Sequence, residues 1–218
     1  MIIFKSFNQL NKVLNYDDNV GFVPTMGSLH LGHISLIKKC NKICKKTLVS
    51  IFVNPTQFNK KTDFKNYPRN LKKDIKILKK LDIDYLLVPN KKDVYKNKHS
   101  FNIKLDKKDK ILCAKFRPGH FEGVLSVIYQ YLKKIKIKNI FLGEKDLQQV
   151  ILIKKFIKKK FKVNVISCKT VRYKNSYAFS SRNNLLSFKD LNIISNIARE
   201  IINLKKKKNK MNDLIPLI

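Results

Sequence analysis

The sequence of 218 residues lacks any apolar run that approaches the roughly 20 residues needed to span a bilayer. Its first residues, Met1 to Lys5, do not have the basic-then-apolar order of a secretory signal. The cysteines form no Cys-x-x-Cys pair, so we expect neither a zinc site nor a disulfide framework. They are Cys40, Cys44, Cys113 and Cys168. These absences predict a cytoplasmic protein with reduced thiols and no membrane partner.

Acidic residues and arginine are scarce as well. The chain has 15 Asp+Glu against 48 Lys+Arg, a formal charge of +33, and only five of the basic residues are arginine. Hydrophobic residues make up 44%, enough to bury a core and to exclude wholesale disorder. Nucleic-acid surfaces usually concentrate charge and use arginine, whereas these lysines are spread through nearly every segment. We interpret the charge as a product of A+T-rich codons and expect no specific nucleic-acid partner.

The few glycines and histidines are clustered. Five of the six glycines and three of the four histidines fall in three short stretches, at 24–33, 116–123 and 141–149. If codon composition disfavours these residues, they should persist mainly where no other residue works. The clustering therefore indicates where the chemistry is located.

Hydrophobic patterning predicts strands that alternate with helices. Short apolar runs bounded by proline or asparagine predict strands at 20–24, 47–53, 85–88, 139–142 and 162–169, and an edge strand at 101–105. Helical spacing is found at 34–46, 71–81, 121–135, 145–160 and 188–204. This order predicts an α/β fold, a doubly wound parallel sheet with helices on both faces. Such sheets bind ligands beyond the carboxyl ends of their strands.

The first glycine-rich stretch, PTMGSLHLGH, lies between a predicted strand and a predicted helix. Gly27 allows a tight turn, and Gly32 allows a ligand to approach the backbone. His30 and His33 are three residues apart and should point the same way. Exposed backbone N–H groups and the positive end of the helix would add to a phosphate receptor. Two imidazoles there could stabilise charge that develops on an α-phosphate.

Polar residues also follow the other strands. Lys145 opens the helix after the 139–142 strand and offers a charge for phosphate. Asp146 beside it could orient this lysine or hold Mg²⁺. Gln57 follows the second strand, Gln149 lies one helical turn after Lys145, and either could bind a carboxylate or hydroxyl. Because these residues lie at turns and helix starts, they could also serve simply as helix or loop caps.

Two further stretches carry isolated cations beside turns. Arg117 and His120 flank a Pro-Gly turn in RPGHFEGV, and Arg182 follows two serines in SSRN. Two hydroxyls with a guanidinium could clamp a phosphate, although serine is common in turns.

In this order the stretches resemble the pantothenate synthetase (pantoate–β-alanine ligase) family of the HIGH-type nucleotidyltransferase superfamily. The resemblance covers about residues 1–200 and rests on PTMGSLHLGH, IFVNPTQF, YPR, RPGHFEGV, GEKDLQQ and SSRN. It implies that ATP and pantoate form pantoyl-adenylate and pyrophosphate, after which β-alanine attacks to give pantothenate and AMP. It also implies Mg²⁺ as cofactor and a homodimer.

The resemblance assigns roles to individual residues. His33, His30 and Lys145 are the implied catalytic residues, with His33 the candidate acid. Gln57, Gln149, Arg117 and His120 are the implied substrate-binding residues, and Asp146 is the implied ligand of Mg²⁺. The implied ATP-binding residues are Met26, Gly27, Ser28, Leu29, His30, Leu31, Gly32, His33, Gly143, Glu144, Lys145, Asp146, Cys168, Phe179, Ser180, Ser181 and Arg182.

Three features depart from the family pattern. The chain has Asn175-Ser176-Tyr177-Ala178 where the family usually reads Asp-Gly-Leu-Ala, and Phe179 replaces the usual methionine. The third is the carboxyl-terminal region: residues 184–218 are expected to form only a helical remnant of the family's closing domain, and residues 1–183 to bind nucleotide and pantoate. Besides an active ligase, the sequence leaves open a decayed nucleotide-binding homologue with little turnover and a basic nucleic-acid-binding protein.

Overall fold

A computed structural model of the chain describes residues 1–14, 19–95 and 103–214, with side chains described as far as residue 205. Its centre is a six-stranded sheet in which every pair of neighbouring strands is parallel. The strands are β1 (Ile2–Phe4), β2 (Val20–Thr25), β3 (Lys46–Ile51), β4 (Tyr85–Leu87), β5 (Asn139–Gly143) and β6 (Asn164–Cys168). The α/β class predicted from the sequence is therefore confirmed.

The strand order β1-β4-β3-β2-β5-β6 reverses direction at β2. The chain builds outward from β2 through β3 and β4, and then returns to place β5 on the other side of β2. The crevice at the carboxyl ends of β2 and β5 is thus the switch point, where sheets of this kind bind ligands.

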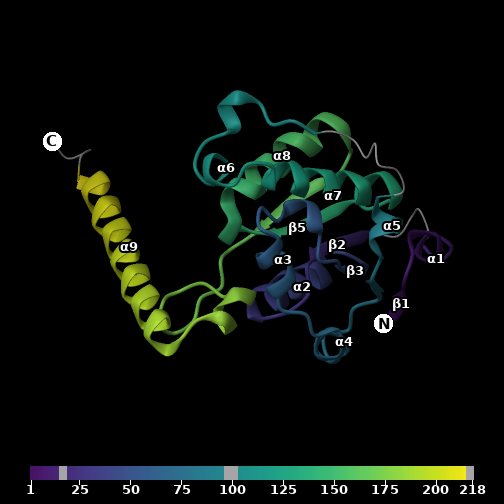
Figure 1. Cartoon of the computed structure of the whole chain (residues 1–218), viewed down its shortest axis with the longest axis horizontal. Coiled ribbons are helices and arrows are strands. Elements are labelled where there is room, and N and C mark those ends of the chain that lie inside the picture. The colour runs from purple at the N-terminus through teal and green to yellow at the C-terminus, as the bar shows by residue number, and fades with distance from the viewer. Residues whose placement is uncertain (15–18, 96–102, 215–218) are drawn as a thin grey trace.

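Helices cover both faces of the sheet (Figure 1). One face packs on α7 (His120–Lys134) and α8 (Leu147–Lys160), and the other on α2 (Leu31–Ile43) and α4 (Leu71–Lys79). Neighbouring residues of one strand enter opposite cores, as Phe22 and Val23 do in β2. Because both faces are buried, the strands read as continuous apolar runs, the pattern on which their prediction depended.

The shorter elements connect these layers. They are α1 (Phe7–Asn11), α3 (Lys61–Asn66), α5 (Lys91–Val94) and α6 (Cys113–Phe116), with the 3-10 turns η1 (Pro55–Gln57), η2 (Lys107–Asp109), η3 (Glu144–Asp146) and η4 (Ser181–Leu185). The last helix, α9 (Phe188–Leu214), extends away from the sheet (Figure 1). No helix in the described ranges has the length and apolar character required for a bilayer span.

One predicted strand was wrong and one real strand was missed. Ile103–Leu105 is not a strand, although Ile103 and Leu105 are buried against the core; residues 101 and 102 lie outside the described ranges. The edge position is taken by β1, whose three residues pair with β4. A three-residue strand is too short to show periodicity, and its pairing with a segment some 80 residues away is invisible to local patterning.

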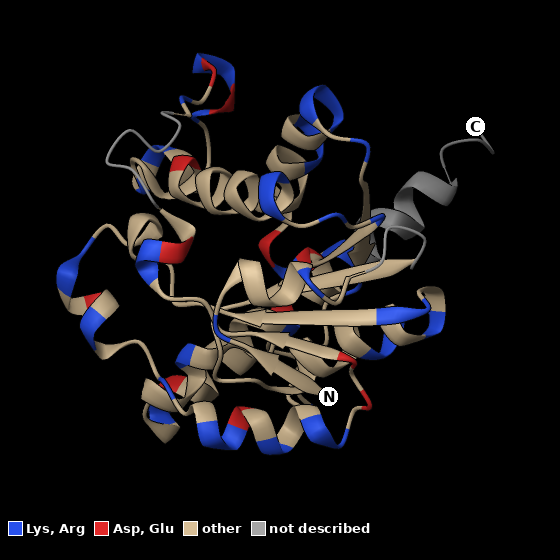
Figure 2. Ribbon diagram, turned by 90° about the vertical axis from the view of Figure 1, so that its right-hand side faces the viewer, with Lys and Arg blue, Asp and Glu red and all other residues tan. Residues whose placement is uncertain are grey.

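Lysine and arginine lie on helices on both sides of the sheet (Figure 2). The spread seen in the sequence is therefore preserved in space. This distribution does not favour a nucleic-acid surface, which needs charge gathered along one groove or face.

A hairpin-like turn connects β6 to η4. Arg172 and Ala178 form an antiparallel bridge, and the Arg172 guanidinium donates to the Ser176 carbonyl oxygen at 2.9 Å. Ser176 has a φ of 75°, a left-handed conformation that costs an L-residue about 1–2 kcal/mol. This is the position at which the resemblance led us to expect glycine, so the substitution leaves local strain in the backbone.

Replacing Ser176 with glycine should raise the free energy of unfolding. Relief of the left-handed strain exceeds the extra chain entropy of glycine, and the expected net gain is about 0.5–1 kcal/mol. Denaturant unfolding of the two proteins measures it. Lys174→Gly is the matched control, because Lys174 has no positive φ, and it should destabilise the fold. If the two changes had equal effects on the free energy of unfolding, the backbone of Ser176 would not be strained.

Candidate active site

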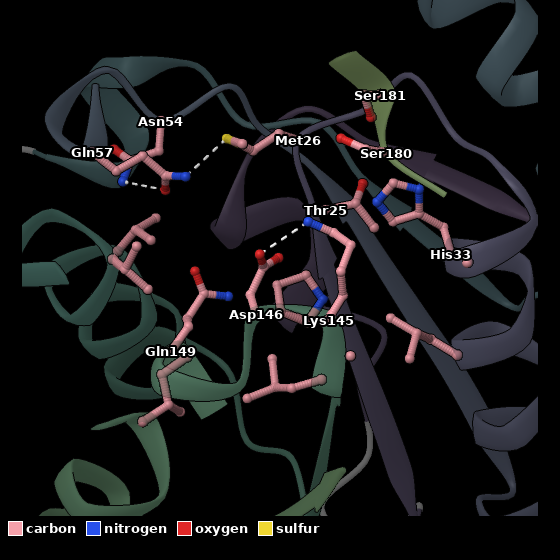
Figure 3. Close-up of a pocket in the computed structure, with 18 of the residues that line it drawn as sticks. Thr25, Met26, His33, Asn54, Gln57, Lys145, Asp146, Gln149, Ser180 and Ser181 are labelled. Atoms are coloured by element: carbon pink, nitrogen blue, oxygen red, sulfur yellow. Dashed lines mark hydrogen bonds and ion pairs between the residues drawn. The ribbon is translucent and has the colours of Figure 1, made fainter. Parts of the chain in front are cut away.

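A cavity of about 250 Å³ opens at the carboxyl ends of β2, β3 and β5 (Figure 3). Each of the six motifs named above contributes residues to its wall, YPR through Tyr67. The predicted site residues that line it are Met26, His30, Gly32, His33, Gln57, Arg117, His120, Gly143, Lys145, Asp146, Gln149, Phe179, Ser180, Ser181 and Arg182.

The rings of the two histidines of the first motif accept hydrogen bonds from backbone N–H groups at the start of α2, and these bonds fix the orientation of the rings. His30 is the N-cap, and its Nδ1 accepts from the Gly32 N–H at 3.1 Å. His33 Nδ1 accepts in turn from the His30 N–H at 3.3 Å. A ring nitrogen that accepts carries no hydrogen, so the proton of each neutral ring lies on Nε2. Both imidazoles are therefore pre-set as Nε2–H donors, with centroids 4.0 Å apart.

The same environment keeps both rings neutral. Burial, assisted by the charge of Lys145, lowers the pKa of His30 to about 4. Burial, His30 and Lys145 lower the pKa of His33 to about 3. At neutral pH the pair thus offers two hydrogen-bond donors without adding positive charge. The formal cation of this group is Lys145.

The backbone N–H groups expected to bind phosphate have partners within the protein. The Gly27 N–H donates to Thr25 Oγ1 at 3.2 Å. The N–H groups of Ser28 and Leu29 donate to the two carboxylate oxygens of Asp74 at 2.9 and 2.8 Å. The sequence did not foresee this carboxylate, which reaches the turn from α4.

Lys145 and Asp146 follow β5 directly and form an ion pair of 2.9 Å at the edge of the cavity (Figure 3). The Asp146 side chain is about half exposed and lies in the wall of the cavity. Mg²⁺ is often bound by one or two carboxylates together with substrate phosphates, so a single carboxylate here fits an ion that arrives with a nucleotide. The described residues contain no cluster of three or more metal-ligating side chains.

The second serine of the SSRN segment is docked on the first motif. Ser181 Oγ donates to the Ser28 carbonyl oxygen at 3.1 Å. Arg182 pairs with Asp63 of α3, with Nη2 at 2.9 Å from Oδ2, and its guanidinium carbon lies 5.3 Å from the centre of the Tyr67 ring. The two signature segments and the 61–74 stretch are thus physically connected.

Phe179, which departs from the family pattern, takes part in an aromatic stack. Its ring lies 3.6 Å from that of Tyr173 and 6.0 Å from that of His30, at 25° in each case. Tyr177 stacks on the far side of Tyr173 at 4.5 Å. The aromatic residue therefore connects the 172–178 turn to the histidine pair, and the change from methionine is accommodated.

The side chain of Gln57 is oriented by Asn54, which is almost fully buried. Asn54 Nδ2 donates to Gln57 Oε1 at 3.1 Å and to the Gly123 carbonyl oxygen at 3.1 Å, while its Oδ1 accepts from Tyr95 at 2.8 Å. The Gln57 amide nitrogen is left with the sulfur of Met26, a weak acceptor, at 3.1 Å (Figure 3). A substrate oxygen would be a better partner for it.

Gly123 is required where α7 meets this turn. A Cβ there would lie 2.3 Å from the Thr56 carbonyl oxygen. The close approach lets His120, one turn earlier, reach the Gln57 carbonyl oxygen from its Nδ1 at 2.6 Å. Because a carbonyl can only accept, His120 carries its proton on Nδ1 and presents Nε2 as an acceptor, the opposite of His30 and His33. Burial lowers the pKa of His120, which favours this neutral form.

Arg117 and Arg182 both line the cavity. Burial, and then the charge of Arg182, lower the pKa of Arg117, whereas Asp63 opposes the effect. A guanidinium group suits a carboxylate or a phosphate, since it can bind either in bidentate fashion.

Gln149 lies across the cavity from Gln57 (Figure 3). The wall around it combines polar groups with apolar side chains, among them Val124, Ile128 and Ile153. The buried side chains of Ser50 and Tyr131 add hydroxyl groups to it. Apolar side chains beside a few placed polar groups fit a small branched hydroxy acid.

Several predicted ATP-binding residues do not line the cavity. Leu29 and Cys168 are buried in the hydrophobic core, and Leu31 is exposed. The remaining ones are Gly27, Ser28 and Glu144. A motif match assigns the same role to every residue of a segment, whereas only some residues of each turn face the cavity.

Sequence reasoning missed Asn54, Asp63, Tyr67 and Asp74. Asp74 had a detectable signal, because it lies on the apolar stripe that Leu71, Leu78 and Leu81 define along its helix. Asp63 and Tyr67 contact Arg182, and Asn54, besides bonding Gln57 three residues on, bonds Tyr95 and Gly123; contacts so far apart in the sequence do not show in single-sequence patterning.

Comparison with known proteins gives one consistent result. The family model described as pantoate-beta-alanine ligase matches residues 2–216. A protein named pantothenate synthetase from Francisella philomiragia is 46% identical over 202 residues, which cover 90% of this chain and 77% of the relative.

Solved structures agree with the family match. Pantothenate synthetase from Thermus thermophilus superposes with a TM-score of 0.92 at 29% identity, covering 96% of this chain and 76% of that one. Pantoate-beta-alanine ligase from Francisella tularensis, complexed with beta-gamma ATP and beta-alanine, has a TM-score of 0.88 at 42% identity, with 98% and 85% covered.

Acidification should leave both histidines of the pair neutral well below the pH at which an ordinary histidine protonates. ¹⁵N chemical shifts should report Nε2–H tautomers at pH 7, with protonation only near pH 4 and below. Between pH 6.5 and 4 the unfolded chain then binds more protons than the folded one, so stability should fall as the pH falls through this window. His33→Asn should reduce that fall. Titration of both rings near pH 6.5 would disprove the buried, capped arrangement.

Proposed function

Since the chain belongs to the pantoate-beta-alanine ligase family, we propose that this cavity carries out both steps of the ATP-dependent joining of pantoate to β-alanine. The enzyme is a pantothenate synthetase by its relatives and its fold. One observation carries the assignment of the site. The histidine pair, Lys145 and the docked Ser181 lie on one cavity, with two glutamines across from each other in the same space.

In the first step a pantoate carboxylate oxygen attacks the α-phosphorus of ATP. A P–O bond forms, the bond to the pyrophosphate group breaks, and pantoyl-adenylate results. We assign the Nε2–H groups of His30 and His33 and the ammonium of Lys145 to the phosphate oxygens, where negative charge develops. Ser180 Oγ, the Ser181 N–H and the Arg182 guanidinium would hold the departing pyrophosphate, while Ser181 Oγ stays bonded to the Ser28 carbonyl oxygen.

In the second step the amine of β-alanine attacks the acyl carbon, AMP leaves with the electrons of the C–O bond, and the nitrogen loses a proton. Gln57 and Gln149 are proposed to hold pantoate through both steps, so that its carboxyl carbon stays in place. Arg117 suits the carboxylate of β-alanine. Neutral His120 presents an acceptor nitrogen that could receive a hydrogen bond from the amine.

Mg²⁺ is proposed to accompany ATP, with Asp146 as its protein ligand. When bound, the ion would neutralise phosphate charge. Asp146, whose carboxylate lies 2.9 Å from Lys145 Nζ, would hold the ion beside this lysine, and Lys145 would contact phosphate.

The domain division, the oligomeric state and the cellular location are also proposed. Residues 1–183 would form the nucleotide- and pantoate-binding unit and residues 184–218 a second unit, in line with the strong exposure of Phe188, Ile197 and Ile201 on α9. A homodimer rests on the family resemblance, and sedimentation velocity is its check. Activity in the cytoplasm fits the free cysteines of the structure.

A coupled assay tests the proposed reaction. With ATP, Mg²⁺, pantoate and β-alanine, the protein should form AMP and pantothenate in equal amounts. Lys145→Met should lower the rate of adenylate formation by about 10²–10³-fold, because it removes the formal cation beside the α-phosphate. His33→Ala should have a similar effect with little change in folding.

Lys154→Met, on the exposed side of α8, is the control and should keep the parent rate. Excess AMP over pantothenate would indicate that the adenylate is lost to water, as in a decayed homologue. Absence of both products from the folded protein would rule out the ligase.

A further inference from the structure

The turn between β2 and α2 has the shape of an anion-binding nest. Gly27 and Ser28 are consecutive residues with positive φ, of 78° and 50°. The N–H groups of Ser28 and Leu29 in this turn converge on one carboxylate, and turns whose successive N–H groups converge in this way bind anions elsewhere. Because serine has a Cβ, Ser28 holds this conformation at a cost and needs a compensating interaction.

The compensation comes from within the chain. Asp74, in the first turn of α4, accepts the Ser28 N–H at 2.9 Å and the Leu29 N–H at 2.8 Å, one on each carboxylate oxygen. Its side chain is 2% exposed, and no ion pair to it occurs within the described ranges. A buried carboxylate is tolerated only when it is hydrogen-bonded, so the nest and Asp74 depend on each other.

The carboxylate also fixes the direction of a carbonyl. The Leu29 N–H and the Ser28 C=O belong to one planar peptide unit and point in opposite directions. When Asp74 holds that N–H, the Ser28 oxygen must face away from α4. There it accepts the hydroxyl of Ser181 at 3.1 Å. One side chain therefore determines how the second signature segment docks on the first.

We propose that Asp74 is a positioning residue that fills this nest in place of a phosphate and thereby sets Ser181 and the histidine pair for ATP. The inference rests on the proposed function of the cavity. It predicts that the triphosphate is bound by side chains, while the Ser28 and Leu29 N–H groups stay bonded to Asp74 throughout the reaction.

Asp74→Asn tests the proposal at nearly constant volume, since an amide cannot accept both N–H groups. We expect the KM for ATP to rise at least tenfold and kcat to fall, with the KM for β-alanine changed less than threefold. Asp84→Asn is the matched control, because Asp84 accepts the Thr47 N–H at 2.8 Å at the other end of the sheet. Asp84 also pairs with Lys46 at 2.8 Å, so the change weakens an ion pair as well as a bond of the same kind, and it should lower stability without altering the KM for ATP.

A double-mutant cycle with Ser181→Ala separates positioning from general destabilisation. If Asp74 acts through the Ser28 peptide, the double variant should be no more than about threefold worse than Asp74→Asn alone. Multiplication of the two single effects would overturn the proposal. So would a folded Asp74→Asn protein with the parent KM for ATP.

Amide hydrogen exchange gives a readout that needs no ligase activity. In the parent protein the Ser28 and Leu29 amides should be protected, and Asp74→Asn should accelerate their exchange at least tenfold while the amides of β3 stay protected. Should Asp74→Asn fail to fold, Asp74→Glu keeps the charge, displaces the oxygens and takes its place. Unprotected Ser28 and Leu29 amides in the parent protein would contradict their bonds to Asp74. If these amides are protected but the protein has no ligase activity, the role of Asp74 in the turn stands and only the proposed function fails.

Discussion

The reversal of strand order at β2 is the constraint on which the rest of the structure depends. It leaves a crevice between the carboxyl ends of β2 and β5 that no crossover helix fills. The histidine pair enters this crevice from the end of β2, and Lys145 enters it from the end of β5. Parallel pairing of the strands, buried on both faces, keeps these ends in register, as in the pairing of Phe22 with Ile140. The core thus sets the distance between groups that lie more than 100 residues apart.

The electrostatic design follows from the same crowding. Lys145 and burial keep His30 and His33 neutral, and their reciprocal hydrogen bonds select the Nε2–H tautomer. The site therefore combines one ammonium with two fixed dipoles. Groups of this kind need little reorganisation when charge develops on a phosphate, which is the main way such a site lowers a barrier. His120 has the opposite tautomer because its partner is a carbonyl, so similar rings carry out different tasks.

Much of the site could be predicted from the sequence, because the signature stretches are local. The strand–turn–helix order, the scarcity of glycine and histidine, and the spacing of His30 and His33 pointed to residues that the structure brings together around one cavity. The supporting contacts were not predictable in the same way. In the sequence Asp74 is recognisable only as an acid on the apolar stripe of its helix, and its role is revealed by its contact with a turn 45 residues earlier. Likewise, Ile2–Phe4 is a strand only because it pairs with β4.

The departures from the family pattern have local physical consequences. Ser176 takes the left-handed backbone that glycine would adopt freely, and Phe179 stacks between Tyr173 and His30. Both changes affect the segment that leads to Ser181, yet Ser181 still reaches the Ser28 carbonyl oxygen. The docking contact therefore forms in the presence of both substitutions.

A crystal structure of this chain with a non-hydrolysable ATP analogue tests the central claim most directly. The account predicts phosphate oxygens within hydrogen-bond distance of His30, His33 and Lys145, with Asp74 still bonded to the Ser28 and Leu29 N–H groups. A phosphate oxygen in the nest, with the Asp74 carboxylate displaced, would contradict it.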